Sequence, residues 1–212
     1  MIKNIWKIDK IFQLLLKDHP NPKTELKYKN QYTFLISVVL SAQSTDVSVN
    51  KATKKLFEIV KNPEEMVKLG ENNLKKYIKK IGLYNSKAKN IILLSKKIIK
   101  KYNGKIPKSF NELISLPGVG NKTASVYQNT ILKFPRIAVD THVFRVSNRI
   151  GIVSAKTTDL TQIKLEAVVP KKWLMIAHHL LILHGRRVCK SQKPNCNYCS
   201  LFSYCQYKGK II

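Results

Sequence analysis

LPGVGNKTASVYQNTILKFPRIAVD, residues 116–140, is the stretch that decides the fold. Its proline cannot sit inside a helix, and Gly118 and Gly120 can take the positive φ angles that other residues avoid. LPGVG therefore predicts a tight turn between two helices. A helix beginning near Asn121 would direct its backbone amides out of that turn, where they can bind a phosphate oxygen.

Two reactive side chains lie at predicted helix starts within this stretch. Lys122 directly follows the turn, and Asp140 precedes Thr-His-Val-Phe-Arg-Val as the N-cap of another helix. An amine and a carboxylate at helix N-termini, beside a phosphate-binding turn, indicate chemistry on nucleic acid. Each feature taken singly also fits an ordinary turn and a solvated lysine, so the interpretation depends on independent features that agree with it.

The four cysteines form one group near the end of the chain, with the spacing Cys189-x6-Cys196-x2-Cys199-x5-Cys205. This grouping argues against a disulfide framework. Four thiolates can hold a tetrahedral zinc ion or a [4Fe–4S] cluster. Zinc ribbons usually arrange their ligands as two short pairs, whereas only one C-x2-C pair occurs here. The uneven spacing therefore favours the larger cluster and leaves zinc as the alternative.

The composition is strongly basic. Lys and Arg number 39 against 12 Asp and Glu, which gives a formal net charge of +27 over 212 residues. Such a balance favours a polyanionic partner, with nucleic acid first and an anionic membrane second. No apolar run is long enough to span a membrane, and the N-terminal segment lacks the uninterrupted apolar core of a signal peptide. We therefore expect a cytoplasmic protein.

Helical periodicity dominates the chain and no convincing strand alternation appears, so we predict an all-α fold. Asn62-Pro63 and the pair Ser109 and Glu112 are predicted helix starts. Further helices are expected at about 5–17, 32–41, 141–150, 159–168 and 171–184. His142, His178, His179 and His184 are interpreted as structural residues.

LPGVGNKTA followed by VDTH resembles the helix-hairpin-helix motif and catalytic aspartate of the endonuclease III family of DNA repair glycosylases. The resemblance extends over nearly the whole chain, through LSAQSTDVSVNKAT and IGLYNSKAKNI to the cysteine run, which matches the family's cluster motif. It implies a two-domain helix-hairpin-helix glycosylase fold. A six-helix domain would span 24–134, and the second domain would join 1–23 to 135–212 and hold a [4Fe–4S] loop at 189–205.

The same resemblance implies the activity. Lys122 would attack the sugar C1′ as a neutral amine, release an oxidised pyrimidine, form an imine and cut 3′ to the abasic site by β-elimination. We expect the positive end of its helix, cationic neighbours and partial burial to favour the neutral amine. Asp140 would stabilise positive charge on the sugar or relay the proton of the amine, and the sequence leaves both roles open.

The partner implied is double-stranded DNA containing damaged bases or abasic sites, lying across the cleft between the domains. The protein would act as a monomer at the nucleoid, without a membrane. Gln43 and Leu83, each on a turn, would insert into the duplex when the base is extruded. The remaining expected DNA contacts are Gly118, Val119 and Gly120 in the turn, and Lys190 and Lys193 in the first cysteine loop.

Two rivals are weaker. Adenine glycosylases of this kind lack a lysine at the position of Lys122 and carry an acidic residue on the second helix, whereas residues 32–45 contain no Asp or Glu. A non-catalytic DNA-binding adaptor would keep the turn and the cysteines without needing Lys122 and Asp140 together.

Overall fold

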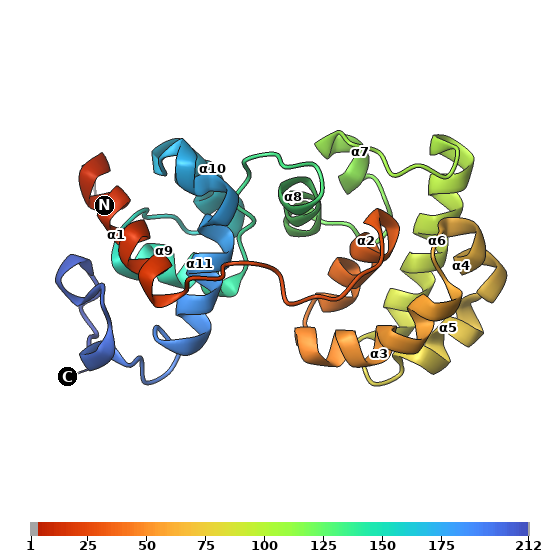
Figure 1. Ribbon diagram of the computed structural model, residues 1–212, viewed down its shortest axis with the longest axis horizontal. Coiled ribbons are helices and arrows are strands. Elements are labelled where there is room, and N and C mark those ends of the chain that lie inside the picture. The colour runs from red at the N-terminus through yellow and green to blue at the C-terminus, as the bar shows by residue number, and fades with distance from the viewer. Residues whose placement is uncertain (1–3, 212) are drawn as a thin grey trace. The chain divides into compact units, whose positions relative to one another are not determined.

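The computed structural model describes residues 4–211, and its regular elements are helices (Figure 1). No strand occurs within this range, which confirms the all-α prediction. The chain forms two compact units. Unit 1 comprises Met1–Thr24 and Lys133–Ile212, and unit 2 comprises Glu25–Leu132.

Unit 2 is built around two helices that other helices cover. The helix predicted at 32–41 is confirmed as α2, in which every residue from Tyr32 to Leu40 is buried. The long helix α6 contacts α2, α4 and α5. The elements of the unit are α2 (Gln31–Ser41), α3 (Asp46–Ile59), α4 (Pro63–Leu69), α5 (Glu71–Ile78), α6 (Tyr84–Tyr102), α7 (Phe110–Ile114) and α8 (Asn121–Thr130).

Two helix starts in unit 2 follow from capping side chains that the sequence had indicated. Asn62 accepts a hydrogen bond from the Glu65 amide at 2.8 Å, with Pro63 in the first helical position. Ser109 accepts from the Glu112 amide at 3.3 Å. These side chains satisfy amides that a helix leaves unpaired at its start, so α4 and α7 begin where predicted.

Unit 1 contains the first helix of the chain and the last. Its elements are α1 (Ile5–Asp18), α9 (Thr141–Ile150), α10 (Thr158–Val168), α11 (Leu174–Arg187) and the 3₁₀ turns Lys171–Trp173, Cys196–Tyr198 and Phe202–Tyr204. The helices predicted at 5–17, 141–150 and 159–168 are confirmed. The one predicted at 171–184 starts as a 3₁₀ turn and continues to Arg187 as α11.

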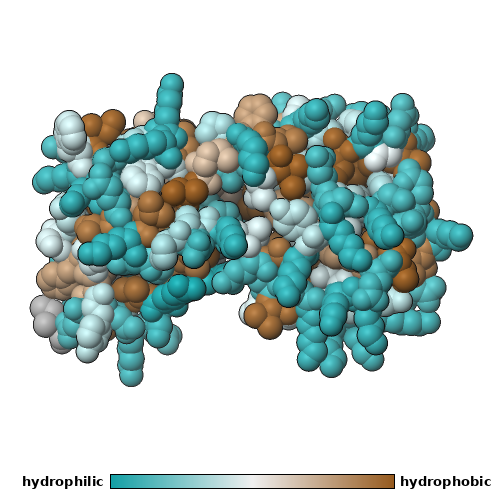
Figure 2. All heavy atoms as spheres, viewed as in Figure 1, coloured by the Kyte–Doolittle hydropathy of each residue, from teal (hydrophilic) through white to brown (hydrophobic). Residues whose placement is uncertain are grey.

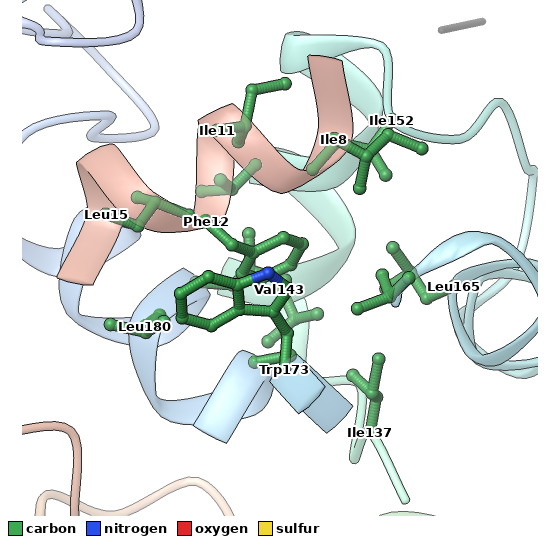
Figure 3. Packing of buried hydrophobic residues seen from close by; sticks show 14 of the residues in the cluster. Ile8, Ile11, Phe12, Leu15, Ile137, Val143, Ile152, Leu165, Trp173 and Leu180 are labelled. Carbon is green, nitrogen blue, oxygen red and sulfur yellow. The ribbon is translucent and has the colours of Figure 1, made fainter. Parts of the chain in front are cut away.

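The core of unit 1 joins α1 to the C-terminal helices (Figure 3). Phe12 of α1 stacks on Trp173 with ring centroids 5.9 Å apart. The indole N–H of Trp173 donates to Asp9 at 2.6 Å, so the polar edge of the ring is satisfied while its face is buried. This core supports α9 and α11, the helices from which Asp140 and the cysteine loop extend.

Hydrophilic side chains cover much of the face shown in Figure 2, as the net charge of +27 requires. Among the residues described, no helix has both the length and the apolar character needed to cross a membrane.

Candidate functional site

The predicted turn between two helices is present, and two buried apolar side chains attach it to unit 2. It connects α7 to α8, and the Val119 amide donates to the Leu116 carbonyl at 3.0 Å. Leu116 and Val119 are buried, with 2% and 5% of their surfaces exposed. These two apolar side chains hold the turn on unit 2 while its backbone stays at the surface. Val119, an expected DNA contact, therefore turns its side chain into the protein.

The two glycines of the turn differ, because only Gly118 adopts the positive φ that the sequence allows at both. Gly118 has φ +77°, and a Cβ at this position would lie 3.1 Å from the Asn90 Cβ of α6. Gly120 has φ −95° and ψ 179°, an extended conformation open to any residue, and a Cβ there would meet no atom within 4 Å. The reason is that the chain reverses direction at Gly118, and Gly120 only leads into α8.

Lys122 is the second residue of α8, which begins at Asn121 as predicted. Its side chain is exposed, so the expected partial burial is wrong. Asn121 and Lys122 lie at the surface, whereas Thr123 to Asn129 are buried in unit 2. Lys122 therefore stands directly after the turn at the positively polarised end of a helix.

Gln43 and Leu83 are both exposed and both left-handed, with φ +54° and φ +58°. Gln43 lies between α2 and α3, and Leu83 immediately precedes α6. The backbones of the two turns come close, because a Cβ on Gly82 would lie 3.6 Å from the Gln43 carbonyl oxygen. Residues 40 positions apart in the sequence are thus displayed side by side on unit 2.

Asp140 is the N-cap of α9, as predicted from its position before Thr141. Its Oδ1 accepts hydrogen bonds from the amides of His142 and Val143, both at 2.9 Å. Two amide donors and the helix dipole stabilise the ionised carboxylate. The half-buried side chain is held in one orientation by these bonds.

Two arginines on α9, which the sequence reasoning missed, tie Asp140's helix to the cysteine loop. Arg145 donates to the carbonyls of Gly185 at 2.9 Å and Cys189 at 3.1 Å. Arg149 donates to the carbonyls of Lys190 at 2.7 Å and Ser191 at 2.9 Å. Their spacing of four residues on one helix face was the available signal, but no periodicity identifies a backbone carbonyl as the partner.

All four cysteine thiols line one small pocket of unit 1, between the ends of α9 and α11. Each cysteine is partly exposed and none is in a disulfide. Within residues 4–211 no three His, Cys, Asp or Glu side chains form a group suited to a single metal ion. The same pocket is also lined by apolar residues, among them Ile150, Val188 and Leu201.

The thiols have polar neighbours from both helices. Nε2 of His184 lies 3.6 Å from Sγ of Cys199, and the Arg149 guanidinium lies 3.8 Å from Sγ of Cys189. Burial raises the pKa of the Cys199 thiol to about 11. A strongly bound electrophile such as a metal can replace the proton on this sulfur, and the proton is then released to solvent.

The expected site residues fall into two sets. Unit 2 carries Lys122, the turn at Gly118 to Gly120, Gln43 and Leu83, and unit 1 carries Asp140 and the cysteines. Lys190 and Lys193, in the first cysteine loop, are both exposed.

These features match a known class of proteins. The model of the HhH-GPD superfamily of base excision DNA repair proteins matches residues 36–171. Endonuclease III of Rickettsia prowazekii is 54% identical over 200 residues, 94% of each chain. Endonuclease III of Escherichia coli (strain K12) is 47% identical over 201 residues, 95% of each chain. The chain thus belongs to the endonuclease III family within this superfamily.

Solved structures agree with this assignment. The trapped covalent intermediate of an endonuclease III with DNA superposes with a TM-score of 0.91, at 40% identity and with 97% of each chain covered. A thermostable thymine-DNA glycosylase matches with a TM-score of 0.83, at 25% identity and with 95% of this chain and 96% of the other covered.

The difference between the two glycines predicts a difference in stability. Gly118→Ala should lower the free energy of unfolding by about 1 kcal/mol or more, because alanine is strained at positive φ. Gly120→Ala should leave it unchanged or slightly raised, because its backbone conformation suits alanine. Urea unfolding of both variants makes the comparison, and equal losses would contradict it. Since Gly120→Ala should fold normally, its affinity for undamaged duplex also reports whether the turn contacts phosphate.

Proposed function

We propose that this protein is a bifunctional DNA glycosylase and abasic-site lyase of base excision repair that removes oxidised pyrimidines such as thymine glycol from double-stranded DNA. The observation that carries the proposal is the position of Lys122. It is an exposed amine on the first turn of a helix, directly behind a turn whose backbone suits a phosphate. Membership of the endonuclease III family supports the same activity.

Lys122 supplies the nucleophile. Its neutral Nζ forms a bond to the sugar C1′ while the bond from C1′ to the base breaks, and the base leaves with the electron pair and takes up a proton. Opening of the sugar ring gives an imine between Lys122 and C1′. Loss of a proton from C2′ then expels the 3′ phosphate oxygen, which cuts the strand, and water releases the lysine.

Asp140 supplies a fixed negative charge. Its carboxylate is oriented by two amide hydrogen bonds, so it needs little reorganisation when positive charge develops on the sugar. In this scheme the same carboxylate also accepts the proton of the attacking amine. We assign both roles to the same group, because charge stabilisation and proton acceptance each require the ionised form.

Gln43 and Leu83 fill the space that the extruded base leaves. The damaged base must leave the stack before C1′ becomes accessible, and unstacking costs a few kcal/mol. A polar side chain beside an apolar one can replace hydrogen bonds and stacking in the gap. Their exposure and the closeness of their two turns support this role.

Cys189, Cys196, Cys199 and Cys205 hold a [4Fe–4S] cluster in this proposal. All four line one pocket with apolar walls, and their uneven spacing suits a cluster better than a single zinc ion. When bound to these four thiolates, a cluster would fix the conformation of the loop and would take no part in base removal. Arg145 and Arg149 would then transmit this rigidity to α9 through their bonds to the loop backbone.

Lys190 and Lys193 contact DNA phosphates outside the lesion. They are exposed on a loop whose backbone is held by Arg149, and Arg186 and Arg187 extend the positive charge along α11. We further propose that residues 24–134 and residues 1–23 with 135–212 act as the two domains of the enzyme. The enzyme would work as a monomer at the nucleoid, where its duplex substrate is found.

The cluster assignment predicts the colour and metal content of the protein. Protein purified anaerobically should be brown and contain about four irons per chain. Iron and zinc analysis with a visible spectrum tests this. A colourless preparation with one zinc per chain would overturn the cluster but leave the proposed catalysis intact.

The assignment of the loop lysines predicts a salt effect. Replacing Lys190 and Lys193 together by Ala should make the slope of log K against log salt shallower, by the amount that corresponds to about one to two lost phosphate contacts. The control replaces Lys7 and Lys10, two exposed lysines of α1, by Ala. Fluorescence anisotropy over a salt series measures both slopes. If the two pairs give the same slope, the cysteine loop makes no phosphate contact.

The two catalytic residues should fail in different ways. Lys122→Gln keeps length and polarity but cannot form an imine, so borohydride should trap no adduct on thymine glycol or abasic-site duplexes. Asp140→Asn keeps Oδ1 as the acceptor for both amides but loses the charge. This variant should remove the damaged base roughly a hundred- to ten-thousandfold more slowly than the unaltered enzyme. Its borohydride trapping should be reduced less on a preformed abasic site than on a duplex that still carries the damaged base.

The control for Lys122 is Lys105→Gln, which changes an exposed lysine elsewhere in unit 2. It should trap like the unaltered enzyme. A trapped adduct with Lys122→Gln would identify another amine as the nucleophile and refute the central assignment.

A further inference from the structure

Lys87 is a buried lysine to which the catalytic scheme gives no role. It lies in the first turn of α6, and 6% of its surface is exposed. Its ammonium donates to the carbonyl oxygens of Leu40 at 2.9 Å and Ala42 at 2.5 Å, and to the hydroxyl of Ser44 at 3.1 Å. The three N–H donors of a lysine are therefore all used.

These acceptors surround the Gln43 turn. Leu40 is in the last turn of α2 and Ala42 is its C-cap, with φ −58° and ψ 119°. A helix leaves its last carbonyls unpaired and carries partial negative charge there, so an ammonium is well suited to the position. Because Ala42 and Ser44 flank Gln43, the side chain of Lys87 binds the chain on both sides of that residue, through the Ala42 carbonyl and the Ser44 hydroxyl.

The backbone of the same lysine holds the other turn. The Lys87 amide donates to the Leu83 carbonyl at 3.0 Å, which is the first helical hydrogen bond of α6. Leu83 is the N-cap of this helix and has no side-chain group to cap it. One residue thus binds the Leu83 turn through its backbone and the Gln43 turn through its side chain.

Both turns adopt a backbone conformation that needs such support. A left-handed residue other than glycine costs roughly 1–2 kcal/mol, and it persists where the surroundings determine it. Leu83 also exposes 60% of a large apolar side chain. Neither feature stabilises the fold, so both are consistent with side chains that are displayed for a partner outside the protein.

We propose that Lys87 is a positioning residue that holds Gln43 and Leu83 together as a preformed pair for insertion into the duplex. This inference rests on the proposed insertion of Gln43 and Leu83. Preformation lowers the conformational entropy lost on binding, because the two turns are already in place when the base leaves the stack. Lys87 itself touches no reacting atom.

The test uses the fluorescence of 2-aminopurine placed opposite an abasic-site analogue in a duplex, which rises when this base loses its stacking. The unaltered holoenzyme should raise the signal. Lys87→Met, which removes the ammonium and keeps an unbranched side chain, should lose most of the rise and bind this duplex about tenfold more weakly. Affinity for undamaged duplex should stay within about twofold, because the phosphate contacts are unchanged.

The control for lost charge is Lys89→Met, which alters an exposed lysine two residues further along α6. It should keep the full signal. Ser44→Ala removes one of the three acceptors and should cause a smaller loss of the same kind, so it carries the test if Lys87→Met does not fold. Melting temperatures of all variants accompany the measurement.

A combined variant separates positioning from general support. In a protein that already carries Gln43→Ala and Leu83→Ala, Lys87→Met should cause no further loss of signal or affinity for the abasic-analogue duplex. A further loss of full size would mean that Lys87 only stabilises the unit. A full signal from folded Lys87→Met, or from Ser44→Ala where Lys87→Met does not fold, would also overturn the proposal. If Gln43→Ala with Leu83→Ala leaves the signal unchanged, insertion itself fails, which is a distinct result.

Discussion

The hydrogen bonds that hold α9 at both ends are the constraint on which unit 1 depends. At its start, one carboxylate oxygen of Asp140 accepts two backbone amides. Further along, Arg145 and Arg149 bind the backbone of the cysteine loop, while Val143 and Val146 are buried in the core. The Asp140 carboxylate and the backbone of the cysteine loop are therefore both attached to one helix.

In unit 2, buried side chains hold surface turns in fixed conformations. Leu116 and Val119 anchor the turn before α8, and the ammonium of Lys87 stands in for a C-terminal cap on α2. A buried lysine is costly unless its donors are satisfied, and here carbonyls and a hydroxyl satisfy them. Leu116 and Val119 through apolar packing, and Lys87 through hydrogen bonds, each hold a surface segment in one conformation.

Much of the local structure around the candidate site was predictable, because turns and helix caps depend on neighbouring residues. Pro117 and Gly118 predict a turn, and Asp140 precedes a helical pattern as its N-cap. The uneven spacing of the four cysteines favours a cluster over a single zinc ion. The predictions about the environment of individual residues were less accurate. Gly120 has an ordinary extended backbone and Lys122 is exposed, since the conformation and burial of a residue depend on how its element meets the rest of the unit.

The sequence by itself determined the helical class and most of the predicted helix limits, because periodicity and caps act within a few neighbouring positions. It also supplied the residues to which we assign the chemistry. The tertiary structure alone decided which distant segments meet. It brought the Gln43 turn to the Leu83 turn, bound both to Lys87, and placed Arg145 and Arg149 against the cysteine loop. A lysine or arginine that donates to a backbone carbonyl leaves no pattern in the sequence, because every residue offers the same carbonyl.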